Sequence, residues 1–248
     1  VPTAEYNPFE VIKTNIIGGQ NIINSCVKFK VNKVIALSTD KAASPINLYG
    51  ATKLASDKLF VSSNNYANPT TKLSVVRYGN VLGSRGSVLP IFMKMSKSGS
   101  FDVTDKRMTR FSLSLEEGVN FVLKCLKLMW GGEIFVPKIP SYNILDVAKA
   151  INNKSKINII GIRPGEKLHE EMISVSDSFN TVESSNFFAI LPYNSFLDWN
   201  MKNYILKNKN IKFKKCKEGF TYSSNTNTNF LTVRELKNLI KKFQNQWS

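Results

Sequence analysis

The chain has 248 residues, 42% of them hydrophobic, which is enough for one large core or for a core with a smaller appended lobe. Lysine and arginine outnumber aspartate and glutamate by 34 to 18, and the net charge of +16 favours a polyanion or an anionic ligand. Three scattered cysteines and one histidine exclude a zinc site of ordinary spacing, and no apolar run is long enough to span a membrane. Isolated thiols are typical of a reducing compartment, so the expected location is the cytoplasm.

The first eighty residues alternate between helical and strand patterns. Asn7 and Pro8 form a helix start, because asparagine can cap a helix and proline fits its first position, and apolar residues then recur at helical spacing. The short apolar run 33–38 predicts a buried strand, residues 49–62 a second helix and residues 73–77 the next strand. This alternation with short loops predicts the α/β class, with a Rossmann-like, doubly wound parallel sheet.

Beyond residue 80 the pattern is looser. Residues 116–129 predict an amphipathic helix, 135–136 a strand and 144–152 a helix, whereas the chain from Ser174 reads as polar and irregular until a closing helix at 233–244. We therefore predict that residues 1–80 belong to the sheet core. Residues 81–248 are expected to form mainly a smaller α/β substrate lobe, with some elements returning to the core.

One expected motif does not occur. A dinucleotide-binding domain normally opens with a strand, a glycine-rich turn and a helix that receives the pyrophosphate. The sequence contains no G-x-G-x-x-G, and Gly79, Gly83 and Gly86 are too widely spaced and follow a late strand. We expect either that the protein binds no dinucleotide or that the first part of the sheet is missing from this chain.

The strongest group of chemically active residues follows the first predicted strand. Residues 38–41 read Ser-Thr-Asp-Lys, and Tyr49 and Lys53 lie four apart on the next helix, hence on one face of it. An ammonium one turn away favours phenolate and lowers the phenol pKa, so the tyrosine could remove a hydroxyl proton near neutral pH. Pairs of surface charges give the same spacings by chance, but the position directly after a buried strand favours a catalytic site.

Two further segments predict phosphate contacts. Residues 80–89 combine glycines that allow close backbone approach with a guanidinium and amides that can bind oxygens, although a mobile surface loop has a similar composition. Residues 163–166, Arg-Pro-Gly-Glu, read as a turn leading to a helix. His169, beside two glutamates on that expected helix, is interpreted as structural or solvated rather than catalytic.

These motifs resemble the extended short-chain dehydrogenases, in which a strand ending in Ser-Thr and a Y-x-x-x-K helix form the hydride-transfer site. The chain is more closely similar to the inverting UDP-N-acetylglucosamine 4,6-dehydratases that begin pseudaminic acid synthesis. The similarity covers nearly the whole chain and is carried by STDKAASPINLYGATK at 38–53, VVRYGNVLGSRGSVLP at 75–90, MTRF at 108–111, GGEIFVPKIP at 131–140 and GIRPGEKLHEE at 161–171. It places the family's glycine-rich segment upstream of Val1, so we expect an N-terminally incomplete copy.

The resemblance implies a reaction in three stages. The C4 hydroxyl of the sugar is oxidised, the acidified C5 proton is removed while the C6 hydroxyl leaves as water, and the hydride returns to C6. It implies that Tyr49 is the C4 base, Lys53 its activator, Lys41 the C5 base, Asp40 the acid at C6 and Thr39 a residue that holds a sugar hydroxyl. Tyr49 also indicates inversion at C5, because retaining relatives tend to carry methionine at that position.

The same resemblance implies NADP as cofactor, UDP-N-acetylglucosamine as substrate and a homo-oligomer, with no nucleic acid partner and no membrane segment in this chain. Residues 1–80 would then be the C-terminal part of an NADP-binding core, and 81–248 mainly a UDP-sugar-binding lobe. The implied cofactor contacts are Leu37, Ser38, Tyr49, Lys53 and Val81. The implied substrate contacts are Thr39, Asn80, Arg85, Gly86, Ser87, Val88, Leu89, Phe92, Arg163 on the diphosphate and Glu166 on a ribose hydroxyl.

The sequence leaves several functions open. A retaining dehydratase would differ in the configuration at C5, and a UDP-sugar 4-epimerase would not need Asp40 and Lys41. A non-catalytic nucleotide or nucleic-acid binder would use the positive charge and would bind polymers with a steep salt dependence. The isolated chain is itself expected to be a fragment with little activity.

Overall fold

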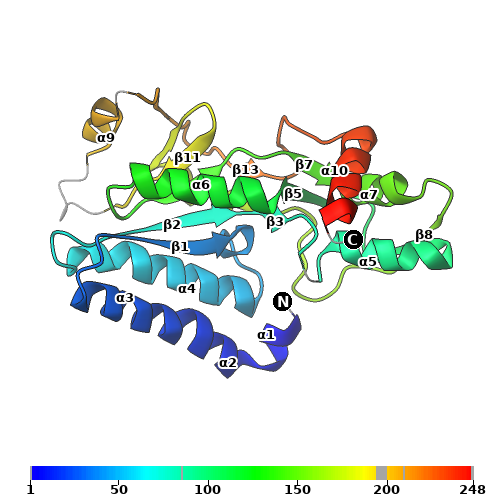
Figure 1. Ribbon diagram of the computed structural model, residues 1–248, viewed down its shortest axis with the longest axis horizontal. Helices are drawn as coiled ribbons and strands as arrows, with labels where there is room; N and C mark the ends of the chain where they lie inside the picture. Colours follow the sequence, from blue (N-terminus) through cyan, green and yellow to red (C-terminus); the bar gives the residue numbers. More distant parts are fainter. Residues whose placement is uncertain (1, 85, 194–199, 209, 247–248) are drawn as a thin grey trace. The chain divides into compact units, whose positions relative to one another are not determined.

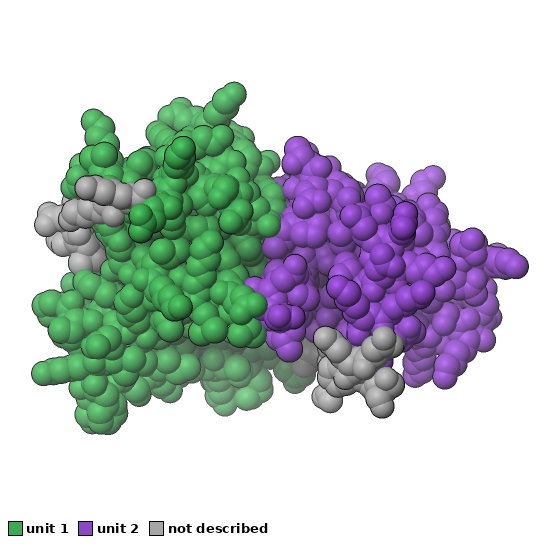
Figure 2. Space-filling model, turned by 45° about the horizontal axis from the view of Figure 1, so that its top comes forward, with its two compact units in different colours: residues 1–78, 119–138, 171–222 green, residues 79–118, 139–170, 223–248 purple. Residues whose placement is uncertain are grey.

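The structure, a computed structural model, describes residues 2–84, 86–193, 200–208 and 210–246 (Figure 1). The chain divides into two compact units, which are described separately (Figure 2). Unit 1 comprises residues 1–78, 119–138 and 171–222, and unit 2 comprises residues 79–118, 139–170 and 223–248. Two segments beyond residue 80 thus pack with the N-terminal part of the chain.

Unit 1 is built on a six-stranded sheet. Its order is β1 (Lys33–Thr39), β2 (Lys72–Tyr78), β6 (Ile134–Pro137), β11 (Phe187–Ile190), β10 (Thr181–Glu183) and β12 (Lys214–Lys215). The first three strands are parallel, and β11, β10 and β12 each run antiparallel to the preceding neighbour. β2 and β6 are buried apolar runs, as strands covered by helices on both faces must be. β1 lies at the edge of the sheet and is mostly only partly buried, so the prediction of a buried strand at 33–38 is wrong in its burial. The predicted α/β class with a Rossmann-like sheet is confirmed, but the sheet is mixed rather than wholly parallel, because β11, β10 and β12 pair antiparallel.

Helices cover both faces of these parallel strands. The N-terminal helices are α1 (Pro2–Tyr6), α2 (Pro8–Ile12), the π-helical turn η1 (Lys13–Ile17) and α3 (Gly18–Lys28). In Figure 1, α3 and α4 (Leu48–Ser62) lie along one face, and α6 (Leu115–Leu128) lies along the other. The apolar stripe of α6 packs through Cys125, together with Met129 just after the helix, against Val76 and Phe135 of the sheet, as its helical spacing predicts. The short η3 (Ser63–Asn65) extends α4.

The region beyond Ser174 differs from its predicted irregular structure. It contains α8 (Val175–Ser178), β10, β11, α9 (Met201–Lys207) and β12, and β9 (Glu171–Ile173) precedes it. All four residues of β11 are buried, and the strand pairs with β6 in the middle of the sheet. A strand of four residues carries too little periodicity to be recognised, so the pairing partner decides its structure.

Unit 2 contains two small sheets and three helices of eight or more residues among its described residues. The first sheet has the order β3 (Asn80–Val81), β5 (Thr109–Leu113) and β7 (Ser141–Asn143), and the second pairs β4 (Ser100–Val103) with β8 (Lys156–Ile159). The helices are α5 (Val88–Met95), α7 (Ile144–Ile151) and α10 (Val233–Gln246), with the turn η4 (Ser96–Ser98) after α5. The strand β13 (Tyr222–Ser223) lies where the chain passes from unit 1 to unit 2.

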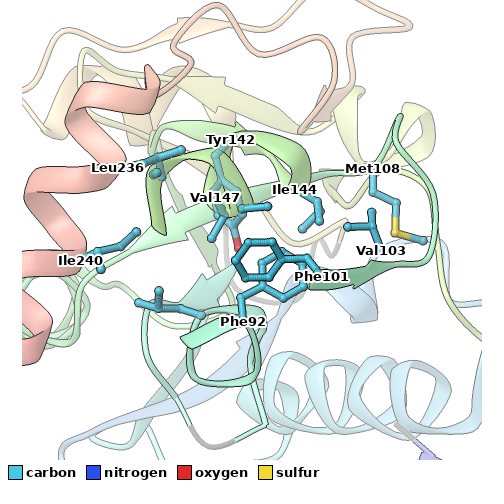
Figure 3. Close-up of a cluster of buried hydrophobic side chains, with 12 residues drawn as sticks. Phe92, Phe101, Val103, Met108, Tyr142, Ile144, Val147, Leu236 and Ile240 are labelled. Carbon is cyan, nitrogen blue, oxygen red and sulfur yellow. The ribbon is translucent and has the colours of Figure 1, made fainter. Parts of the chain in front are cut away.

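A hydrophobic core joins these elements of unit 2. Phe92 of α5 packs against Phe101 of β4 with their ring centroids 5.1 Å apart, and Leu236 and Ile240 of α10 close the cluster beside Val147 (Figure 3). Phe101 has no exposed surface. The amphipathic pattern of α7 and α10 thus gives unit 2 a core of its own. In the described part of the chain, no helix is both long enough and apolar enough to cross a bilayer.

We expect Phe101→Ala to lower the free energy of unfolding by about 3–5 kcal/mol, because it removes a fully buried ring and leaves a cavity. Urea denaturation followed by circular dichroism measures the loss. Phe29→Ala is the matched control: the Phe29 side chain is 74% exposed, so its removal should change stability by no more than about 0.5 kcal/mol. Equal effects of the two substitutions would contradict this packing.

Candidate active site

The end of β1 places three polar residues next to one another. β1 ends at Thr39, and a 3₁₀ turn, η2 (Asp40–Ala42), follows it. The Thr39 hydroxyl caps this turn by accepting a hydrogen bond from the Lys41 amide at 3.3 Å. The same hydroxyl donates to Oδ1 of Asp40 at 2.9 Å. The turn therefore fixes the direction of both the Asp40 and the Lys41 side chains.

Asp40 and Lys41 form a half-satisfied ion pair. The Lys41 Nζ lies 3.1 Å from Asp40 Oδ1, with the Asp40 side chain 1% exposed and that of Lys41 21% exposed. Asp40 Oδ2 is buried and has no hydrogen-bond partner among the residues that the structure describes. Buried carboxylate oxygens are rarely left without a partner, and such an atom indicates a position for a ligand group. One carboxyl oxygen is thus anchored, and the other is buried with unused hydrogen-bonding capacity.

The helix α4 carries the Tyr49–Lys53 pair against this turn. Asn47 caps the helix by accepting a hydrogen bond from the Gly50 amide at 2.8 Å. Gly50 allows close contact, because a Cβ at this position would collide with the Lys41 carbonyl and touch Pro45. The sequence Tyr-Gly thus serves to bring the first turn of α4 onto η2, which places Tyr49 near Lys41.

We expect Gly50→Ala to lower the free energy of unfolding by about 1–3 kcal/mol, because the added methyl group overpacks the contact between α4 and η2. Catalytic activity should fall as well, since η2 carries Asp40 and Lys41. Gly18→Ala is a suitable control, because a Cβ there meets no heavy atom closer than 3.4 Å. Thermal unfolding of both variants tests the contact, and a Gly50→Ala variant as stable as the Gly18→Ala one would refute it.

The electrostatics of Tyr49 differ from the expectation drawn from the Y-x-x-x-K spacing. Burial raises the pKa of the Tyr49 phenol above its ordinary value, and the cation that lowers this pKa is the Lys41 ammonium rather than Lys53. The Lys53 Nζ donates a hydrogen bond to the Leu37 carbonyl at 2.7 Å, and burial lowers its own pKa. The Y-x-x-x-K spacing correctly placed Tyr49 and Lys53 on one helix face. It could not show that Lys41, rather than Lys53, is the cation that lowers the phenol pKa.

The residues of unit 1 fit the nicotinamide end of a dinucleotide. The Lys53 ammonium has three N–H donors, and one of them donates to the Leu37 carbonyl. The other two could donate to ribose hydroxyls. Leu37 is 49% exposed on β1 and offers an apolar surface beside that ammonium. Ser38 is buried one residue further along, facing Asp57. No group of three or more His, Cys, Asp or Glu side chains within the described residues could hold a metal ion.

The residues predicted to contact the substrate belong to unit 2, apart from Thr39. Asn80 lies on β3, and Ser87 precedes the first turn of α5. Asn80 Oδ1 and Ser87 Oγ are buried without a hydrogen-bond partner in the described part of the chain, and the first amides of α5 have no acceptor within their helix. The Ser87 hydroxyl at the N-terminus of α5 can donate to a phosphate oxygen, whereas Asn80 Oδ1 can only accept, for example from a sugar hydroxyl.

The remaining predicted substrate contacts are placed less favourably. Leu89 and Phe92 are buried in the core of unit 2, so only their backbone could reach a ligand. Gly86 is exposed with a φ of 76°, a left-handed conformation that glycine adopts without strain. Val88 is partly buried in unit 2, and Arg85 lies outside the described residues. Val81, the predicted cofactor contact in this unit, is also partly buried.

The segment 163–169 is a turn without the predicted helix. The Arg163 amide donates to Glu166 Oε2 at 3.3 Å, which closes the turn, and the Arg163 side chain is 60% exposed. The bend that follows leads directly to β9, because His169 is held at Nδ1 by the Thr109 hydroxyl at 2.8 Å. Burial and the nearby Arg110 lower the His169 pKa. These contacts hold His169 in a packed position, which agrees with its interpretation as a non-catalytic residue.

Sequence reasoning missed three residues beside the catalytic candidates. Asp57 and Arg77 form a fully buried ion pair, 3.3 Å between Nη2 and Oδ2, and Tyr78 follows Arg77 on β2. A signal was present in the sequence: an arginine inside an apolar strand requires a buried counter-ion. Asp57 continues the Tyr49–Lys53 face by one further helical turn.

Comparisons with known proteins identify relatives of this chain. Residues 1–192 match the family described as polysaccharide biosynthesis protein. Over 243 residues, 97% of this chain and 72% of the relative, the chain is 54% identical to the UDP-N-acetylglucosamine 4,6-dehydratase (inverting) of Campylobacter jejuni. It is 38% identical to the UDP-glucose 4-epimerase of Rickettsia canadensis, over 97% of this chain and 70% of the relative.

A solved structure agrees with the sequence relatives. The X-ray structure of Pen from Bacillus thuringiensis superposes with a TM-score of 0.83 at 34% identity, covering 98% of this chain and 73% of that one. The matched residues include both units of the chain described above. The chain therefore belongs to the polysaccharide biosynthesis protein family, within the group that includes the inverting UDP-N-acetylglucosamine 4,6-dehydratases.

Proposed function

We propose that the protein removes water from UDP-N-acetylglucosamine to give a UDP-4-keto-6-deoxy amino sugar with inversion at C5, the first step of a pseudaminic acid-type pathway. One observation carries this proposal: a buried carboxyl group with a free oxygen lies 3.1 Å from the ammonium that also lowers the pKa of the Tyr49 phenol. The 54% identity to the inverting dehydratase of Campylobacter jejuni supports the choice of substrate.

The cofactor of this reaction is a nicotinamide dinucleotide, NADP by family resemblance, with Lys53 and Tyr49 at its ribose and Leu37, Ser38 and Val81 as further contacts. When bound, it supplies the acceptor for the C4 hydride and the donor of that hydride to C6. Tyr49 takes the proton of the C4 hydroxyl while the hydride leaves C4. Thr39 holds a sugar hydroxyl next to Asp40.

Asp40 and Lys41 divide the elimination between an acid and a base. Transfer of one proton along their 3.1 Å contact gives a neutral amine and a neutral carboxylic acid, the pair of forms that the step requires. The Lys41 amine then removes the C5 proton, and Asp40 protonates the departing C6 hydroxyl, which restores the original ion pair.

The protons of the full cycle balance. Two protons move from the sugar to the side chains, one from the C4 hydroxyl and one from C5. Two protons move back, one that leaves with the water and one that is added to C5. Inversion requires that the last proton arrives on the face opposite to the one from which the first left C5. A donor other than Lys41 is then needed, and the Tyr49 phenol, which has received the C4 proton, fills that role.

The UDP portion is proposed to bind the residues of unit 2. Asn80, Ser87 and the first amides of α5 would meet phosphate and sugar oxygens, together with Arg85, Gly86, Val88, Leu89 and Phe92. Arg163 would contact the diphosphate, and Glu166 a ribose hydroxyl. The unsatisfied Ser87 Oγ, which can donate to a phosphate oxygen, and the unsatisfied Asn80 Oδ1, which can accept from a sugar hydroxyl, support this placement.

A second candidate is a UDP-sugar 4-epimerase, favoured by the 38% identity to the Rickettsia canadensis protein of that name. Epimerisation uses Tyr49, Lys53 and the cofactor but no elimination, so Asp40 and Lys41 would have no chemical role. Purified protein incubated with UDP-N-acetylglucosamine and NADP, followed by mass spectrometry, separates the two candidates. The dehydratase gives a product lighter by one water, whereas an epimerase gives a product of unchanged mass.

A further inference from the structure

Unit 1 contains a largely buried row of charged side chains, Asp57, Arg77 and Asp177, to which the proposed reaction assigns no role. Arg77 of β2 is 1% exposed. Its guanidinium contacts Asp57 of α4 at 3.3 Å and Asp177 of α8 at 3.3 Å, and it donates a hydrogen bond to the Met172 carbonyl at 3.0 Å. Burying an arginine is costly unless its charge is compensated, so the two carboxylates hold it in place.

The position of this row connects it to the candidate active site. In the parallel pairing of β1 and β2, Arg77 lies opposite Ser38, immediately before Thr39 and η2. On α4, Asp57 lies one turn beyond Lys53 and two turns beyond Tyr49, on the same face of the helix. Arg77 therefore fixes Asp57 at the end of the helix face that carries the catalytic pair.

Asp57 acts on Lys53 through its charge. Burial penalises the Lys53 ammonium and lowers its pKa, and the Asp57 carboxylate opposes this effect. Burial also raises the pKa of Asp57, but the permanent charge of Arg77 acts against protonation of the carboxyl group. Among the described residues, the other charged or titratable groups that act on Tyr49 are Asp40 and Lys41 from η2 and Tyr78 from β2. Glu5 of α1 lies beside them and accepts a hydrogen bond from the Leu48 amide at 2.7 Å. The contact from η1, Asn15 to Thr52, carries no charge.

We propose that Asp57, anchored by Arg77, is a positioning residue that keeps Lys53 protonated and directed at the Leu37 carbonyl beside Tyr49. This inference rests on the proposed function, because it assigns Lys53 a role in that reaction. Asp57 itself touches no reacting atom. It acts through Lys53, whose ammonium must persist up to the working pH for the Tyr49 site to function.

The test measures the protonation of Lys53 directly. Trace acetylation across a pH series, quantified for Lys53 by mass spectrometry, reports the pH at which its amine becomes reactive and needs no turnover. Asp57→Asn removes the negative charge at nearly constant volume, and the pH of half-maximal labelling should fall by about one unit. In the dehydratase assay, the alkaline limb of kcat should move to lower pH by the same amount, since Lys53 loses its proton sooner.

Two further variants separate positioning from support of the fold. Asp177→Asn removes the other partner of Arg77 but leaves the Asp57 carboxylate, so stability should fall while Lys53 labelling stays at its original pH. Asp57→Glu keeps the charge and should restore the wild-type labelling. If Asp57→Asn does not fold, Asp57→Asn/Arg77→Met removes both charges of the pair and should give the same shift.

Unshifted Lys53 labelling in folded Asp57→Asn, or in the double variant, would overturn the proposal and leave Asp57 a purely structural residue. Absence of dehydration by the full-length wild-type protein would instead count against the proposed function. Because labelling does not depend on turnover, the two failures are distinguishable.

Discussion

Lys41→Met is expected to slow the elimination of water by about a thousand-fold, the typical contribution of a positioned acid–base group. The physical reason is that C5 loses its base and Asp40 loses the partner with which it shares a proton at 3.1 Å. Oxidation at C4 should survive with a loss of about ten-fold or less, because only the influence of Lys41 on the Tyr49 pKa is removed. Reduced nicotinamide should therefore accumulate in a single-turnover absorbance measurement.

Lys58→Met provides the control for this substitution. Lys58 is an exposed lysine on α4, close in sequence to the site but with no assigned role, and its loss should leave elimination unchanged. An active Lys41→Met enzyme that still releases water at the wild-type rate would remove the basis for a dehydratase. It would leave the epimerase as the better candidate.

Tyr49→Phe is expected to reduce the overall reaction by up to about ten-thousand-fold, the upper end of acid–base effects. This variant loses the base for the C4 hydroxyl, so no ketone forms and the later steps have no substrate. In contrast to Lys41→Met, no reduced nicotinamide should accumulate. The phenol of Tyr49 is partly buried and its removal leaves the ring in place, so folding should be preserved.

Tyr78→Phe is the matched control for the loss of a phenol. Tyr78 lies on β2 and burial raises its pKa, as for Tyr49, but it lies outside the Y-x-x-x-K pair. Its loss should change kcat by less than about ten-fold. Equal losses for the two tyrosines, with both variants folded, would show that Tyr49 has no special role.

The elements that sequence patterns predicted well are those with many residues of one period. The strand at 33–38, the helix at 49–62 and the amphipathic helix at 116–129 appear within one or two residues of their predicted bounds as β1, α4 and α6. Each of these elements has a hydrophobic pattern that fits the surface it packs against in an α/β sheet. The structure favoured by the local sequence is therefore also the one favoured by tertiary packing.

The elements that could not be predicted depend on distant partners. β11 is a strand because β6 and β10 pair with it, and the turn at 163–166 leads to a strand because His169 and Glu170 are fixed by hydrogen bonds to Thr109 and Ser224. The division into units has the same cause, since residues 171–222 return to the first sheet. Short segments of this kind carry no periodic signal of their own.

The candidate site shows the same division between local and distant effects. Spacing alone placed Tyr49 and Lys53 on one helix face and put Asp40 and Lys41 at a strand end. It did not give the direction of the Tyr49 pKa, which burial raises, nor the Asp57–Arg77 pair behind Lys53. Burial and long-range charge depend on how β2 packs beside β1, and no local pattern contains that information.

The central claim is that one hydride leaves C4 of the sugar and returns to C6 around the loss of water. UDP-N-acetylglucosamine carrying deuterium at C4, incubated with the protein and NADP, tests it in one NMR spectrum of the product. The account predicts a 4-keto sugar whose C6 methyl group carries the deuterium. Deuterium that remains at C4 of a sugar with its C6 hydroxyl intact would contradict it.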